Sequence, residues 1–61
     1  NGFLAELSAE DRLLFIGRYF ALESIESLAE HNGISRNAVN IRLSRMRKKL
    51  KRQLEERGLF L

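Results

Sequence analysis

The sequence predicts an all-α fold, a domain of three or four helices that ends in one long helix. The 61 residues include no proline and only four glycines, a composition that disfavours a turn-rich β fold. Three serines, Ser8, Ser24 and Ser35, each stand directly before a segment whose apolar residues recur at helical spacing. This is the arrangement expected of helix N-caps, so three successive helices are predicted.

The length and composition limit what the chain can be. A chain of about 60 residues has room for one small domain, so we expect residues 1–61 to form a single unit. Without cysteine there is no disulfide and no thiolate metal site, and the apolar runs are too short to cross a membrane. The one histidine, His31, lies beside a predicted turn, and the chain has no phosphate-binding glycine loop. We therefore expect no metal, no cofactor and no enzymatic activity.

The net charge of +3 conceals a strong segregation along the chain. Residues 1–34 carry a net charge of −4, whereas residues 35–61 carry +7. A small domain with this distribution is suited to a polyanionic partner on one face, although a solvated basic helix has the same composition.

The first predicted helix follows Ser8, with Asp11 completing a capping-box pattern. It carries more apolar residues than one narrow stripe can hold, so we expect it to be packed on two sides and its aromatic rings to lie in the core. Phe3, Leu4 and Leu7 are expected to fold back onto it. The apolar residues of this helix are Leu13, Leu14, Phe15, Ile16, Tyr19 and Phe20.

The second predicted helix is short. Ser24 is its N-cap candidate, and Ile25, Leu28 and Ala29 form its apolar stripe. Asn32-Gly33 ends it about two turns later, because glycine tolerates the left-handed conformation of a helix C-terminus. Ile34 is then expected to reach the core from the turn.

The third predicted helix begins after Ser35 and runs over residues 36–57, with Gly58 as its stop signal. Its apolar residues are spaced by 4, 3, 4 and 4, which matches the helical period: Val39, Leu43, Met46, Leu50 and Leu54. Two short helices cannot cover its second half, so either Leu59, Phe60 and Leu61 fold over it or a partner does.

The face of the third helix opposite this stripe is polar and basic. It carries Asn37, Ile41, Ser44, Arg45, Lys48 and Arg52, with Asn40 and Lys51 beside them. Asparagine pairs with an adenine edge, arginine with a guanine edge, and an apolar group contacts a thymine methyl. The composition therefore indicates a helix that lies in a DNA major groove, with Asn40 and Arg45 discriminating bases.

Other polar residues of this helix suit phosphates. Its N-terminus offers free amides and a partial positive charge at Ser35, Arg36 and Asn37. Further along, Arg47, Lys48 and Lys51 lie where a sugar-phosphate backbone would pass. Arg42 lies at the edge of the buried stripe, and two roles stay open for it: pairing with a carboxylate of the second helix, such as Glu26 or Glu30, or contacting phosphate.

The spacing of Ala29, Gly33 and Val39 predicts a helix-turn-helix: a small residue for close approach, a glycine for the turn and a β-branched residue at the crossing.

Residues 7–61 resemble region 4 of bacterial RNA polymerase sigma factors of the sigma-seventy class, in particular the compact extracytoplasmic-function type. The resemblance rests on an ordered series of pieces: Leu7 with Arg12, Arg18-Tyr19-Phe20, Ser24 with Leu28-Ala29, Gly33-Ile34-Ser35, Val39, Arg42-Leu43-Ser44-Arg45-Met46-Arg47 and Lys49-Leu50.

The resemblance implies a cytoplasmic module of transcription initiation. Its recognition helix would bind the minus-thirty-five promoter element, and another surface would dock on the flap of the polymerase β subunit, with an anti-sigma factor as a further possible partner. The family's base-contacting positions fall on Asn40, Ile41, Ser44 and Arg45. Asn40 and Ile41 replace the family's usual basic and small polar pair, which leaves the promoter sequence open.

A complete sigma factor also needs a region that melts DNA, so the chain is expected to be a fragment of a longer protein. Two alternatives remain at this stage: the helix-turn-helix output domain of a response-regulator-type transcription factor, and a helical protein-interaction module that binds no DNA.

Overall fold

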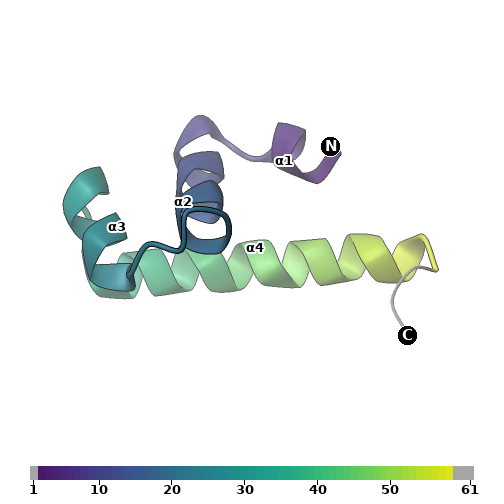
Figure 1. Ribbon diagram of the computed structural model, residues 1–61. Helices are drawn as coiled ribbons and strands as arrows, with labels where there is room; N and C mark the ends of the chain where they lie inside the picture. The colour runs from purple at the N-terminus through teal and green to yellow at the C-terminus, as the bar shows by residue number, and fades with distance from the viewer. Residues whose placement is uncertain (1, 59–61) are drawn as a thin grey trace.

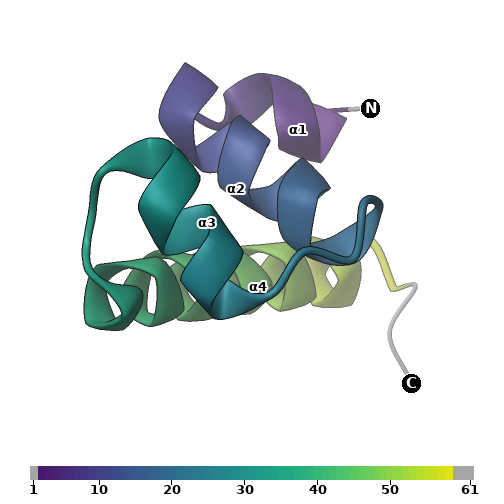
Figure 2. The same cartoon turned by 60° about the vertical axis from the view of Figure 1, so that its left-hand side comes forward.

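The computed structural model describes residues 2–58, which form four helices: α1 (Gly2–Glu6), α2 (Ala9–Tyr19), α3 (Ile25–Asn32) and α4 (Arg36–Glu56). Helix α4 runs the length of the molecule, and the other three helices lie together on one side of it (Figures 1 and 2). No strand occurs among residues 2–58, so the all-α prediction with a long final helix is confirmed. The short helix α1 was not predicted.

Each of the three predicted serine caps is present. In every case the serine has extended backbone geometry, and its hydroxyl oxygen accepts a hydrogen bond from the backbone N–H three residues later. This bond satisfies one of the amides that the first turn of a helix leaves unpaired. The N–H···Oγ distances are 3.2 Å for Asp11 to Ser8, 3.0 Å for Ser27 to Ser24 and 3.0 Å for Ala38 to Ser35.

The turn between α3 and α4 depends on Gly33. This residue adopts the left-handed conformation (φ 64°, ψ 32°), which costs a side-chain-bearing residue energy and costs glycine none. The next amide, of Ile34, donates to the carbonyl of Ala29 at 3.1 Å. Ile34 is then half-buried against the core, as predicted.

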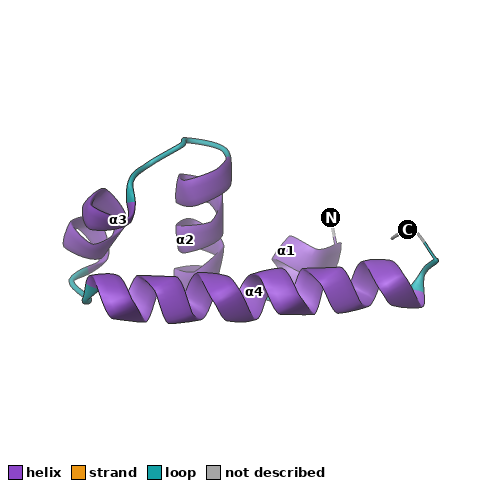
Figure 3. Cartoon of the chain, turned by 90° about the horizontal axis from the view of Figure 1, so that it is seen from below, coloured by secondary structure: helices purple, strands orange, loops and turns teal. Residues whose placement is uncertain are grey.

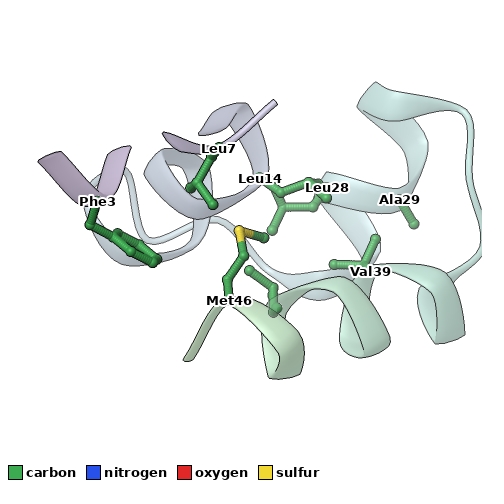
Figure 4. Packing of buried hydrophobic residues seen from close by; sticks show 8 residues of the cluster. Phe3, Leu7, Leu14, Leu28, Ala29, Val39 and Met46 are labelled. Atoms are coloured by element: carbon green, nitrogen blue, oxygen red, sulfur yellow. The ribbon is translucent and has the colours of Figure 1, made fainter. Parts of the chain in front are cut away.

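The core lies between α4 and the three helices that cover it. The most buried side chains are Val39 and Leu43 of α4 and Leu14 of α2, each 1% exposed or less. Figure 4 shows the buried side chains pointing into the space between the helices. The whole cluster consists of Phe3, Leu7, Leu14, Leu28, Ala29, Val39, Leu43 and Met46.

The expectation that α2 is packed on two sides with its aromatic rings in the core is confirmed only in part: Phe3 packs on Phe15 as expected, but Phe20 and one side of the helix are exposed. Leu14 is buried, but Leu13 is 63% exposed, Ile16 38% and Phe20 70%. These three residues are spaced by 3 and 4 and so share one side of the helix. Since α3 and α4 both pack on the Leu14 side, this apolar stripe is left in solvent.

Helix α1 takes part in covering the second half of α4. The side chain of Gln53 donates to Glu6 at 3.0 Å, and Lys49 lies 3.6 Å from the same carboxylate. Phe3 is buried and lines a small cavity together with Leu50 of α4. The expected fold-back of Leu59, Phe60 and Leu61 falls outside the described residues.

The contact between α2 and α3 is close at Gly17. A Cβ added there would lie 2.7 Å from Leu28 Cδ2 and 2.9 Å from Glu23 Oε2, both below the normal contact distance.

In an open helix, replacing glycine by alanine stabilises the folded state by about 0.5–1 kcal/mol. Here we expect Gly17→Ala to destabilise by about 1–3 kcal/mol, because Leu28 would have to leave its packed position. Chemical denaturation followed by circular dichroism measures the change, and a variant as stable as the unaltered chain would contradict it.

Candidate nucleic-acid interface

The predicted base-contacting residues lie on the side of α4 that the other helices leave open. Asn40 and Arg45 are exposed, and Ile41 is 43% exposed, while Ser44 is half-buried. Viewed from below, the ribbon of α4 lies in front of the ribbons of the other helices (Figure 3). Three of the four are therefore accessible, with Asn40 toward one flank of α4 and Arg45 toward the other, and Ser44 is partly covered.

The predicted phosphate-contacting residues are all exposed as well. They fall into a group at the N-terminus of α4 and a group in its middle. The first group is Ser35, Arg36 and Asn37, and the second is Arg47, Lys48 and Lys51. They flank the predicted base contacts along the helix.

The basic side chains of α4 differ in whether their charge is compensated. Arg36 pairs with Glu26 of α3 at 3.1 Å, with both side chains exposed, so this ion pair is weak. Arg47 donates to the neutral hydroxyl of Tyr19. Within residues 2–58, the side chains of Arg45 and Lys48 make no hydrogen bond and no ion pair. Arg45 and Lys48, together with the exposed Arg52, are therefore available to an external ligand.

Arg42 pairs with a carboxylate, but with a different one from those predicted. Its guanidinium lies 3.7 Å from Asp11 at the start of α2, and Glu26 pairs with Arg36 instead. The reason is that α2 crosses α4 at the Arg42 level, a feature that depends on how the helices pack. Of the two roles left open for Arg42, the structure therefore shows pairing with a carboxylate.

Two carboxylates, Asp11 and Glu6, lie on one flank of α4, and Glu26 lies on the other flank near the start of the helix. Asp11 and Glu6 stand next to Arg42 and Lys49, at 3.7 Å and 3.6 Å. Arg45 shares an open depression with Asp11 on this same flank. The result is a basic helix whose positive charge is partly neutralised on the side of α1 and the start of α2.

The opposite flank of α4 is formed with the end of α2 and the start of α3. An open depression there is lined by Arg18, Glu26, Arg36, Asn37 and Asn40, among others. Arg18 is not among the site residues predicted from the sequence. Its guanidinium donates to the backbone carbonyl of Glu23 at 2.9 Å and so holds the loop before α3.

His31 has a local role. Its Nδ1 lies 2.9 Å from Glu23 Oε1, which also accepts a hydrogen bond from the Ser27 hydroxyl. The described part of the chain contains no group of three or more residues arranged to hold a metal ion. Within the same part, no helix has the length and apolar character needed to cross a bilayer.

Comparison with known proteins identifies the family. The family model described as sigma-70, region 4 matches residues 3–50, which is most of the chain. No curated protein and no solved structure gives a significant match. The match includes the turn around Gly33 and most of α4, the elements that form the exposed polar face. The chain therefore belongs to the sigma-70 region 4 family, whose members are non-enzymatic transcription factor domains that recognise promoter DNA and interact with RNA polymerase.

Proposed function

We propose that this domain recognises the minus-thirty-five promoter element with α4 while it is docked on the β flap of RNA polymerase, as part of a longer cytoplasmic sigma factor. The observation that carries the proposal is the open side of α4, on which the uncompensated cations Arg45 and Lys48 and the amide of Asn40 are all exposed. A helix with one buried and one open polar side is the form in which a helix-turn-helix enters a major groove.

The roles of the side chains follow from their chemistry. Base edges would be contacted by Asn40, Ile41, Ser44 and Arg45, through paired hydrogen bonds and contact with a thymine methyl. Phosphates would be contacted by Ser35, Arg36, Asn37, Arg47, Lys48 and Lys51, which position the helix without discriminating sequence. The amides at the start of α4 add a partial positive charge.

Selection of random duplex DNA by the 61-residue chain tests the proposal. We expect a recurring short sequence to be enriched, and binding to weaken with salt. About six phosphate contacts give a log–log slope near −5. A protein-interaction module would show no enriched duplex, and enrichment of a two-fold repeated site would favour the response-regulator type of domain instead.

Arg45 and Lys48 are expected to differ in their contributions. Arg45→Ala should cost about 1–3 kcal/mol on the selected duplex and relax the preference at one base pair, because its fork of donors would pair with a guanine edge. Lys48→Ala should weaken binding to all duplexes by the same factor and flatten the salt slope by about one unit. Fluorescence anisotropy with the selected duplex and its single-base variants measures both. Equal loss on every duplex for Arg45→Ala would contradict its assignment.

The apolar stripe of α2 supports the polymerase side of the proposal. Leu13, Ile16 and Phe20 stand exposed on one side of a helix, and exposed apolar patches mark protein contacts. The DNA-facing side of α4 is polar and basic, so the two partners would occupy chemically different surfaces. We place the β flap on this stripe.

Two isoleucines of similar exposure, Ile16 at 38% and Ile41 at 43%, provide a matched pair for testing this arrangement. Ile16→Ala should weaken binding to the polymerase core by about 1–2 kcal/mol through lost apolar burial and leave DNA affinity unchanged. Ile41→Ala should weaken binding to the selected duplex and leave the affinity for the polymerase core unchanged. Surface-coupled core enzyme and labelled duplex give the two affinities, and loss of both affinities in either variant would argue against separate surfaces.

A further inference from the structure

One hydrogen bond joins the end of α2 to the middle of α4. Arg47 Nη1 donates to the Tyr19 hydroxyl at 2.9 Å, across 28 positions of sequence. Both side chains are exposed, with Tyr19 at 39%. No carboxylate pairs with either of them within residues 2–58. The positive charge of Arg47 is therefore held in place but not neutralised.

The pair still has donors to offer. A phenol oxygen that accepts one hydrogen bond keeps its own proton for donation, and a guanidinium has five N–H groups, of which this contact uses one. Tyr19 and Arg47 together therefore present an O–H and several N–H donors at one point on the surface. Phosphate oxygens are the acceptors that fit such a cluster of donors with a net positive charge.

The position of the pair matches the proposed DNA face. Ser44 lies four residues after Asn40, and Arg47 lies three residues after Ser44. At this spacing the three residues form one row along α4. On the opposite flank, Asp11 and Glu6 pair with Arg42 and Lys49, and their carboxylates would repel a phosphate backbone. On the Tyr19 flank, Glu26 pairs with Arg36 near the start of α4, whereas Arg47 further along has only the neutral Tyr19 hydroxyl as its partner. A phosphate strand on this flank would therefore meet the uncompensated charge of Arg47.

The Tyr19 ring is supported from behind by two aromatic contacts. It packs on Phe15 with 4.8 Å between ring centroids, and Phe15 packs edge-on against Phe3 at 5.3 Å. Phe3 is only 5% exposed. Because the ring is held by packing, the hydroxyl loses little conformational freedom when it binds a ligand.

We propose that Tyr19 and Arg47 bind a single backbone phosphate of the duplex, with the Tyr19 O–H and the Arg47 guanidinium donating to it together. This inference rests on the proposed function and adds Tyr19, a residue of α2, to the DNA contacts. The contact carries no sequence information, since phosphates are the same at every position.

Tyr19→Phe tests the proposal, because it removes the hydroxyl and keeps the ring against Phe15. We expect affinity for the selected duplex and for a scrambled duplex to fall by the same factor, about 3- to 10-fold. The salt slope should stay unchanged because the phenol is neutral. Arg47→Gln should also weaken both duplexes and should flatten the slope by about one unit. Thermal melting of each variant shows whether the fold is retained.

Lys49→Gln is the matched control. It removes the same charge two residues along α4, on the flank where Lys49 already lies 3.6 Å from Glu6. We expect a smaller loss of affinity than for Arg47→Gln. Equal losses for the two variants would mean that only the overall charge matters, and would overturn the proposal.

Duplexes with a neutral methylphosphonate at one position locate the phosphate. At one position the substitution should weaken binding of the unaltered chain and should cause no further loss in the Tyr19→Phe/Arg47→Gln double variant. Full affinity of a folded Tyr19→Phe variant, or the absence of any such position, would overturn this inference alone. If the unaltered chain binds no duplex, the proposed function fails, and this inference fails with it.

Discussion

The packing of the apolar stripe of α4 under Leu14 and Leu28 is the interaction on which the rest of the structure depends. Val39, Leu43 and Met46 are 3% exposed or less, and they come from one side of the helix. Burying this side sets the rotation of α4 about its own axis, because a rotated helix would expose the stripe to water. The opposite side, with its amide and guanidinium groups, is presented to solvent for the same reason.

The short helices give α4 its direction and leave it accessible. α3 is tied to α4 through the left-handed Gly33 and the buried Ala29, so the two helices meet at a close, defined angle. α2 crosses α4 and brings acidic side chains to one flank and Tyr19 to the other. The electrostatic asymmetry of the α4 surface is thus produced by the packing of its neighbours as well as by its own composition.

The acidic first half of the chain has a structural use that its net charge does not reveal. Asp11 and Glu6 pair with residues of α4, and both arginines of this half bind backbone carbonyls: Arg12 those of Leu4 and Leu7, and Arg18 that of Glu23. The two ion pairs among these contacts lie near the surface and are individually weak. By pairing with Arg42 and Lys49, Asp11 and Glu6 partly neutralise one flank of α4 and leave exposed cations such as Lys48 uncompensated.

Local features of the structure followed from the sequence alone. The three serine caps, the left-handed glycine and the apolar period of α4 were predicted correctly, because each depends on groups within a few residues along the chain. The exposure of Asn40, Ile41 and Arg45 on one face was predictable for the same reason. Their assignment to particular bases and phosphates stays a prediction.

The tertiary structure decided the contacts between segments that are far apart in sequence. The pairing of Arg42 with Asp11, the hydrogen bond between Arg47 and Tyr19, and the exposed stripe at Leu13 and Phe20 all depend on where α2 crosses α4. The spacing of apolar residues predicts which residues share a side of one helix. It does not state which side of the next helix they meet, because that is set by how whole side-chain surfaces fit together.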